Sequence, residues 1–196
     1  MPHRDIVQRA IGSYKETIDE AISFATTFTL DPLLSLTFNT DTIGSESLLS
    51  RVRGLRTGNK KTDARKCAIY VFSMASTTPA ERIFDALSSA NEQRKADGKK
   101  KNLCAVNRDF AGSPTLYVGR SFKPRDRISQ HLAASDTATY AMHLDQWAKP
   151  LALEIDLHVY DVPQFEDNPT LERAMNVVET GLWDHLRPLL GRRGDK

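Results

Sequence analysis

Residue types that can bind a phosphate, move a proton or hold a cation recur at informative spacings in this chain. Tyr70 and Tyr117 each lie in a short run of β-branched and aromatic residues, so both are expected on strands. Arg127 and His131 are four residues apart, which places them on one face of a helix. Glu179 lies near the edge of an apolar helical stripe. Brought together, these side chains would provide hydrogen-bond donors, a fixed cation and a carboxylate ligand.

Each of these residues also has a purely structural interpretation. A tyrosine in a strand usually packs in the core, and an arginine beside Asp126 or Glu179 can form a surface ion pair. A histidine or glutamate on a helix can simply be solvated. Taken singly, no residue favours a function over packing; their combined order and spacing do.

The elements that must position these residues are predicted from hydrophobic periodicity. We expect strands at 67–73, 103–108, 115–119 and 151–160, and helices at 4–28, from Pro79 to about 94, from Pro124 to about 134, at 139–148, and from Asn168-Pro169 to about 190. The alternation in 151–160 indicates one packed and one wetter face. The fold class is therefore α+β, a small, mainly antiparallel sheet flanked by helices.

Composition narrows the class of protein. The 196 residues are 40% hydrophobic and 27% charged, which is ordinary for a globular domain and excludes a disordered or collagen-like chain. The net charge of +2 means that binding to nucleic acid must be argued from local clusters. The two cysteines, Cys67 and Cys104, are expected as buried reduced thiols. With no apolar run of membrane length and no apolar signal core, we expect a cytoplasmic protein without a membrane partner.

A basic stretch at 51–66 is the best candidate for a domain boundary. It carries seven Lys and Arg residues against one acid, Asp63, and includes loop-forming glycines. We therefore predict an N-terminal helical extension with a basic loop at 1–66 and a core domain at 67–196. A solvated linker and a phosphate-contacting arm are both open interpretations of the stretch.

Together, the candidate residues resemble the GIY-YIG nuclease superfamily. The first motif stands here as Ala68-Ile69-Tyr70 and the second as Tyr117-Val118-Gly119. Arg127 and His131 follow in YVGRSFKPRDRISQHL, and Glu179 follows in VVETGLWDHLRP. The resemblance covers about residues 67 to 190, and the block from YVG to the histidine is its most specific part.

The chain departs from the family pattern at three points. Ala68 replaces the usual glycine, at little cost if the backbone is extended. Forty-six residues separate Tyr70 from Tyr117, which implies an insertion at about 75–114 that contains a helix and an extra strand. Pro188 is followed by Leu189-Leu190 rather than by the family's asparagine.

The resemblance implies a metal-dependent DNA endonuclease, a phosphodiester hydrolase. Glu179 would hold Mg²⁺ or Mn²⁺, weakly until a phosphate joins, and Arg127 would bind the scissile phosphate. Tyr70 would orient or deprotonate the attacking water, and Tyr117 would hydrogen-bond within the site or to the phosphate. His131 would relay a proton or contact the phosphate.

Nearby basic residues would hold the DNA backbone without reading its sequence; these are Arg120, Lys123 and Arg125. Restriction or defence, a mobile element and repair are all settings open to such an enzyme. One site per chain would favour a homodimer or two successive nicks. His143 is a further candidate for the site, whereas His158 and His185 are expected to be structural or at the surface.

Two other classes of function stay open on the sequence. One is a nucleic-acid-binding module that does not cleave. The other is a protein-interaction domain that docks a partner through its N-terminal helix.

Overall fold

The computed structural model describes residues 29–55, 67–75, 78–99, 103–133, 140–162 and 169–193, with side chains of the last segment from 172 onward. It also describes positions 8, 12, 15, 16, 18–20, 22, 23, 25 and 26, all of them helical, within the helix predicted at 4–28. Most of the basic stretch, residues 56–66, lies outside the described residues, as does Asn168, the predicted helix cap.

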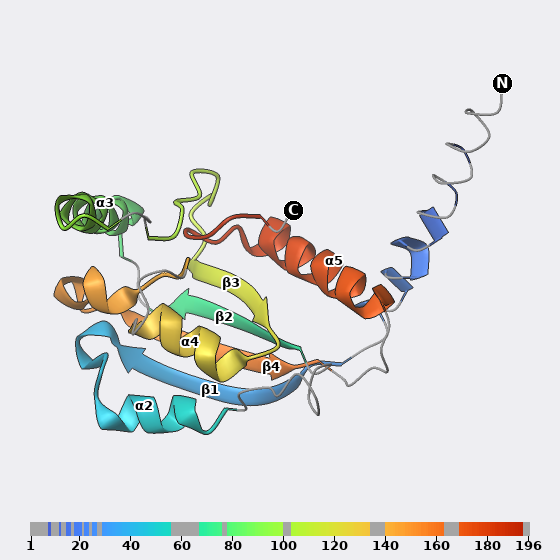
Figure 1. Ribbon diagram of the computed structural model, residues 1–196, viewed down its shortest axis with the longest axis horizontal. Helices are drawn as coiled ribbons and strands as arrows, with labels where there is room; N and C mark the ends of the chain where they lie inside the picture. The colour runs from blue at the N-terminus through green and yellow to red at the C-terminus, as the bar shows by residue number, and fades with distance from the viewer. Residues whose placement is uncertain are drawn as a thin grey trace.

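A four-stranded sheet forms the centre of the fold (Figure 1). Its strands are β1 (Asp31–Asn39), β2 (Ala68–Met74), β3 (Thr115–Ser121) and β4 (Glu154–Asp161). They lie in the order β1-β4-β2-β3, and every neighbouring pair is antiparallel. The α+β class with an antiparallel sheet is therefore confirmed.

The helices begin where the sequence provides starting signals. They are α2 (Glu46–Arg53), α3 (Ala80–Ala96), α4 (Pro124–Leu132) and α5 (Pro169–Leu186). The Ser45 hydroxyl accepts a hydrogen bond from the Leu48 N–H at 3.4 Å, which caps α2. Proline begins both α4 and α5, where its fixed φ suits the first turn and its missing N–H costs nothing.

Two apolar clusters cover the two faces of the sheet. The larger includes Tyr70 and Phe72 of β2, the inward residues of β1 and β4, and residues from α2, α3 and α4. The smaller holds Ile69 of β2 with Met175 of α5. Because Ile69 and Tyr70 are consecutive in a strand, they point to opposite faces. Helix α5 therefore lies on one face of β2 and β3, and α4 lies on the other.

The predicted alternation in 151–160 and the predicted state of the cysteines are both confirmed. Leu153, Ile155, Leu157 and Val159 are buried, whereas the residues between them are partly or fully exposed. Cys67 and Cys104 are both buried thiols. Ala68 lies in extended backbone of β2, which explains how alanine can stand in the place of glycine.

Two predicted elements are wrong. Residues 103–108 contain only an isolated bridge between Val106 and Leu190, not a strand. In the predicted helix at 139–148, the described residues from 140 onward form a short 3₁₀ helix at Leu144–Gln146 rather than an α-helix, and a second follows at Lys149–Leu151. The backbone of His143 and of Ala152 is left-handed, with φ of 50° and 48°, which breaks any continuous helix and delays β4 to Glu154.

The predicted division at residue 66 does not separate the folded elements. β1 and α2 both precede it, yet β1 pairs with β4 from Asp31 to Asn39. Leu36 and Phe38 of β1 and Val52 of α2 belong to the same core as β2 and β4. The segment at 31–55 is therefore part of the sheet domain.

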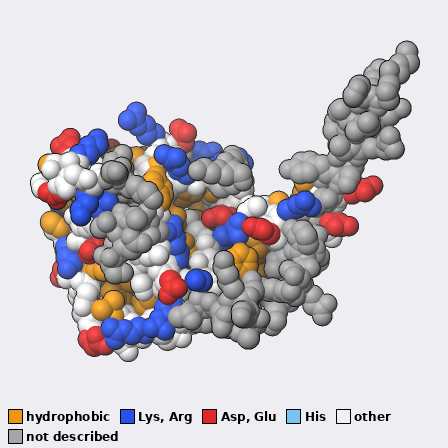
Figure 2. Space-filling view, viewed as in Figure 1, with side chains coloured by type: hydrophobic (Ala, Val, Ile, Leu, Met, Phe, Trp, Pro, Cys, Tyr) orange, Lys and Arg blue, Asp and Glu red, His pale blue; other side chains and the backbone are white. Residues whose placement is uncertain are grey.

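The outer surface carries mixed charge. Figure 2 shows Lys and Arg side chains spread over the visible face and interspersed with Asp and Glu. Within the described part of the chain, no helix is both long enough and apolar enough to cross a membrane.

Candidate functional site

Two tyrosines from neighbouring strands lie at the centre of the candidate cluster. Tyr70 of β2 pairs with Gly119 of β3, and Phe72 pairs with Tyr117, so both phenols rise from one face of the sheet. Their rings are nearly parallel, at 5°, with centroids 6.3 Å apart. The motif tyrosines, separated by forty-six residues of the chain, therefore lie side by side.

Gly119 makes this arrangement possible. A Cβ atom at this position would lie 2.5 Å from the Tyr70 hydroxyl oxygen and 2.9 Å from Tyr117 Cε1. Neither ring can withdraw easily, because Tyr70 is only 1% exposed and packed among core residues. The glycine of the second motif is therefore needed for the close approach of the two phenols to the backbone of β3.

His131 of α4 contacts the hydroxyl of Tyr70. Its Nδ1 accepts a hydrogen bond from the Met142 backbone N–H at 3.2 Å, and its Nε2 lies 3.2 Å from the Tyr70 hydroxyl oxygen. Because Nδ1 is the acceptor, a neutral ring carries its proton on Nε2 and donates it to that oxygen. His131 therefore positions Tyr70 and is itself fully buried.

Burial sets the protonation of this cluster. It lowers the pKa of His131 well below the usual value, and the positive charge of Arg127 acts in the same direction. Burial also raises the pKa of Tyr70 far above the usual value for a phenol; Tyr117 adds to this rise and Arg127 opposes it. Burial likewise raises the pKa of Tyr117. At neutral pH the cluster therefore holds protonated phenols and a neutral imidazole.

Arg127 of α4 is held in place by neighbours on two sides. Its Nη1 donates to Gln130 Oε1 at 3.2 Å, and its Nη2 donates to the backbone oxygen of Tyr140 at 2.7 Å. Interaction with Tyr70 and Tyr117 raises the pKa of Arg127 in spite of its burial. The guanidinium is thus a fixed positive charge beside the phenols.

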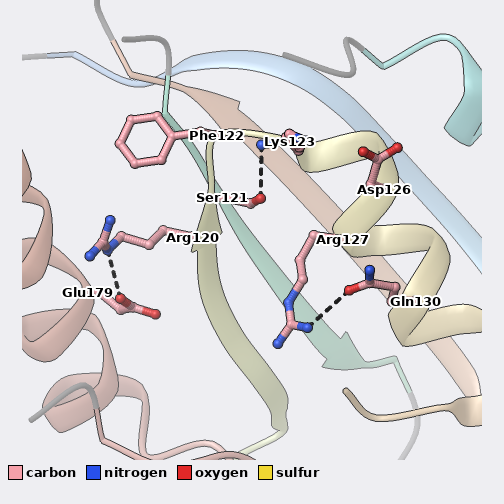
Figure 3. Close-up of a pocket in the computed structure, with 8 residues that line it drawn as sticks. All are labelled: Arg120, Ser121, Phe122, Lys123, Asp126, Arg127, Gln130 and Glu179. Atoms are coloured by element: carbon pink, nitrogen blue, oxygen red, sulfur yellow. Dashed lines mark hydrogen bonds and ion pairs between the residues drawn. The ribbon is translucent and has the colours of Figure 1, made fainter. Parts of the chain in front are cut away.

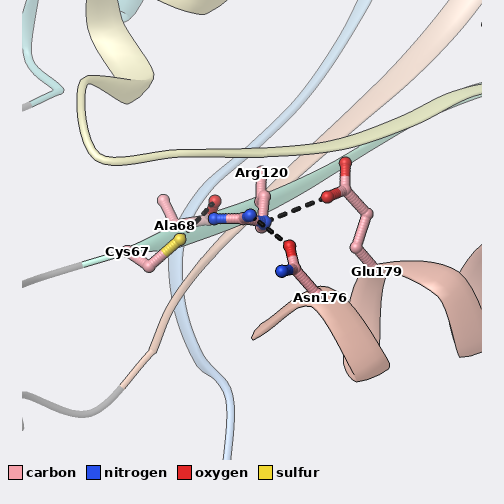
Figure 4. Close-up of polar contacts among 5 residues, drawn as sticks. All are labelled: Cys67, Ala68, Arg120, Asn176 and Glu179. Atoms are coloured by element: carbon pink, nitrogen blue, oxygen red, sulfur yellow. Dashed lines mark hydrogen bonds and ion pairs between the residues drawn. The ribbon is translucent and has the colours of Figure 1, made fainter. Parts of the chain in front are cut away.

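Glu179 reaches the site from α5, on the other side of β3. Its Oε2 accepts a hydrogen bond from Arg120 Nε at 3.0 Å, and Arg120 Nη2 also donates to Asn176 Oδ1 (Figure 4). Burial raises the pKa of Glu179, while the charge and hydrogen bonds of Arg120 lower it. Arg120, predicted to contact nucleic acid, is therefore engaged with α5.

A polar hollow of about 610 Å³ lies beside this cluster; Arg127 and Glu179 line it, whereas Tyr70, Tyr117 and His131 do not. Figure 3 shows Arg127 on α4 and Glu179 on α5 on opposite sides of the strand β3 that separates them. The residues that line it are Arg120, Ser121, Phe122, Lys123, Asp126, Arg127, Gln130 and Glu179. Three positively charged side chains line the hollow: Arg120, Lys123 and Arg127. They make it suitable for an anion the size of a phosphate group.

The hollow offers a divalent cation two carboxylates, and Glu179 is the one predicted to hold it. A carboxylate that faces an open polar hollow fits a hydrated hard cation such as Mg²⁺ or Mn²⁺. Asp126 lies on the α4 side of the same hollow. Within the described ranges, no three His, Cys, Asp or Glu side chains form a metal-binding group. Any ion at Glu179 would therefore take most of its ligands from water and substrate.

The structure brings together the side chains predicted for catalysis. Tyr70, Tyr117, Arg127 and His131 form one cluster, and the charge of Glu179 acts on both phenols. Lys123 lines the hollow, whereas Arg125 does not.

The structure describes three other histidines. His143 is buried behind His131, and its positive charge would lower the pKa of that residue further. His158 lies at the surface, 3.0 Å from the Ser35 hydroxyl, and His185 is exposed on α5.

Sequence reasoning missed the residues that hold the site together. Asn176 and Gln130 each lie three positions from a predicted residue on the same helix, a spacing that could have identified them. The backbone oxygen of Tyr140 and the backbone N–H of Met142 carry no side-chain signal and were out of reach of any motif.

Neither a protein-family model, a curated protein nor a solved structure matches this chain. The resemblance to GIY-YIG nucleases therefore rests on the sequence motifs alone.

Proposed function

We propose that this protein is a metal-dependent endonuclease that hydrolyses phosphodiester bonds of DNA in the hollow between α4 and α5. The observation that carries the proposal is the convergence of two tyrosines, an arginine and a histidine on one cluster, with Glu179 across the same hollow. These residues come from four elements and span more than half of the chain. Packing alone does not require so many polar groups to gather in one part of the molecule.

Arg127 would bind the scissile phosphate. Its side chain is already oriented by Gln130 and by the Tyr140 carbonyl, so little conformational freedom is lost on binding. A fixed guanidinium stabilises the negative charge that develops on the phosphate oxygens during attack. Lys123 and Arg125 would add contacts to neighbouring phosphates, which gives affinity that depends on salt.

Tyr70 would orient the attacking water with its phenol. The phenol is protonated in the resting site, so it acts first as a hydrogen-bonding group and not as a base. The Nε2–H of His131 fixes the position of the Tyr70 oxygen. Tyr117 would hydrogen-bond to the phosphate beside Arg127.

Glu179 would hold the divalent cation, Mg²⁺ or Mn²⁺. Such an ion, when bound, offsets charge on the phosphate and lowers the pKa of a coordinated water. We further propose that the enzyme acts in the cytoplasm, in restriction, defence or a mobile element, and that a homodimer or successive nicks would cut both strands.

A binding module without cleavage is the second candidate. The Arg120–Glu179 ion pair favours it, because it occupies the proposed metal ligand. The protonated phenols favour it as well, because no base stands ready at neutral pH.

Nicking of supercoiled plasmid DNA separates the two candidates. With Mg²⁺ or Mn²⁺ present, we expect the wild type to cut, and Glu179→Gln and Arg127→Ala each to lose at least about 100-fold in rate. Glu172→Gln, which removes an exposed carboxylate from the same helix, should cut like the wild type.

Two results would contradict the nuclease assignment. Equal cutting by wild type, Glu179→Gln and Arg127→Ala would remove the site from the reaction. Salt-dependent DNA binding with no cutting by the wild type in either metal would establish the binding module instead.

A further inference from the structure

The guanidinium of Arg120 donates hydrogen bonds to two residues of α5. Its Nε donates to Glu179 Oε2 at 3.0 Å while its Nη2 donates to Asn176 Oδ1. The two acceptors are three residues apart on α5, so they face β3 together. Figure 4 shows the side chain lying between the strand and the helix. This is a two-point contact, more specific than an ordinary surface ion pair.

The contact is largely shielded from water. The side chains of Arg120 and Glu179 are 18% and 26% exposed, whereas those of the Arg53–Glu46 pair on α2 are 53% and 75% exposed. An ion pair in this setting is screened less than one at the surface. A carboxylate neutralised in this way is a weaker ligand for a cation, which must either displace the guanidinium or share the carboxylate with it.

The same hollow offers Arg120 an alternative partner. Arg120, Lys123 and Arg127 all line it, so a bound phosphate would lie within a group of cations. A guanidinium binds a phosphate at least as well as it binds a carboxylate. In both cases it can donate two parallel N–H hydrogen bonds. Phosphate entry would therefore compete with Glu179 and Asn176 for Arg120.

We propose that Arg120 is a latch on the metal ligand: it holds Glu179 until a backbone phosphate enters the hollow, then turns to the phosphate and leaves the carboxylate to the divalent cation. The inference rests on the proposed nuclease function and adds an order of binding to it, nucleic acid before metal. Since coupling between two ligands is reciprocal, the metal also strengthens nucleic-acid binding by the same factor. The latch would keep the free protein from loading metal before substrate is present.

Binding of Mn²⁺ to the full chain tests the latch directly, by loss of the free-ion signal in electron paramagnetic resonance. Without nucleic acid, Arg120→Gln should bind Mn²⁺ about tenfold more tightly than wild type, a change typical of removing one competing ion pair. Asn176→Ala removes one of the two acceptors of Arg120 but keeps the Arg120 charge beside Glu179. It should raise Mn²⁺ affinity by about two- to threefold. Glu179→Gln should abolish binding at this site.

Lys123→Gln is the matched control. It removes a positive charge from the lining of the same hollow but breaks no contact with Glu179. We expect less than about a twofold change in Mn²⁺ affinity, because exposed charges are screened. An equal gain in Lys123→Gln and Arg120→Gln would reduce the effect to general electrostatics and overturn the latch.

A second readout measures the coupling. A short duplex with a phosphorothioate backbone, chosen to resist cleavage, should tighten Mn²⁺ binding to the wild type by about tenfold or more. In Arg120→Gln the duplex should tighten it less, because the latch is already open. Equal tightening in both proteins would overturn the latch.

Failure of the latch and failure of the nuclease assignment give different results. Unchanged Mn²⁺ affinity in Arg120→Gln and Asn176→Ala, with binding still lost in Glu179→Gln, overturns the latch and leaves the nuclease site standing. Mn²⁺ binding that survives Glu179→Gln overturns the metal site, and the latch with it.

Discussion

The polar side chains of the two halves of the sheet lie in opposite surroundings. On β1 and β4, Thr37 donates to Asp156 at 2.5 Å and Ser35 lies 3.0 Å from His158, and both pairs are exposed. On β2 and β3, Tyr70 is bonded to His131 in the core. Water can replace either partner of an exposed pair, whereas a buried partner left alone has no substitute.

The difference shows that burial, and not residue type, distinguishes the candidate site. Both halves contain histidine and a hydroxyl side chain on neighbouring elements. On β2, helix α4 covers Tyr70, and burial moves the pKa values of Tyr70 and of His131 on that helix far from their usual values. A change on this side should therefore cost more than the equivalent change on the other.

The largest expected effect is that of Gly119→Ala. The added methyl would lie 2.5 Å from the Tyr70 hydroxyl oxygen, so β3 or the buried ring must move. We expect a loss of about 3 kcal/mol in the free energy of unfolding, as for overpacking in a rigid core. Chemical denaturation measures it.

Gly181→Ala is the control for this substitution. Nothing lies within 4 Å of a Cβ at Gly181, which is exposed on α5. Alanine should stabilise that helix by about 0.5–1 kcal/mol. Equal stability of the two variants would mean that the tyrosines do not crowd β3.

Tyr70→Phe should have the next largest effect. It leaves the buried Nε2–H of His131 without its acceptor, which costs about 1–3 kcal/mol of unfolding free energy. Thr37→Val removes the hydroxyl of an exposed pair and should change stability by less than about 0.5 kcal/mol, because water solvates Asp156 instead. Similar losses in the two variants, measured by urea denaturation, would erase the contrast between the two halves.

The smallest effect concerns pH. The pKa of His131 is lower in the folded protein than in the unfolded chain, where it is about 6.5, so below that pH the unfolded state binds more protons. The free energy of unfolding should therefore fall as the pH drops below about 6.5, by up to about 1.4 kcal/mol per pH unit. Urea denaturation between pH 7 and pH 5 measures this slope.

His131→Gln should flatten the slope, and His158→Gln, which removes an exposed ring from the other half of the sheet, should keep it. If the free energy of unfolding of His131→Gln changes with pH as steeply as that of the wild type, the buried imidazole does not cause the pH dependence.

The strands and helices that carry strong periodicity could be predicted from the sequence. The alternation in 151–160 predicted which face of β4 is buried, and proline predicted where α4 and α5 begin. The four-residue spacing of Arg127 and His131 placed both on α4. The tyrosines, arginine, histidine and glutamate of the site followed from motif order.

The rest depends on contacts that no local pattern encodes. β1 contains Pro32 and mixed side chains, and only its pairing with β4 makes it a strand. The tautomer of His131 depends on a backbone N–H eleven residues away. The engagement of Arg120 by α5 depends on how that helix packs on β3, which lies far from it in the chain.

The order of the strands bears on how this protein can be shortened. β4 is hydrogen-bonded on both sides, and β1 protects one of them from Asp31 to Asn39. A fragment that begins at residue 67 would keep every motif residue yet expose the unpaired backbone of β4, an edge that recruits strands from other molecules. Such a fragment is expected to aggregate, whereas one that begins just before β1 keeps the barrier in place.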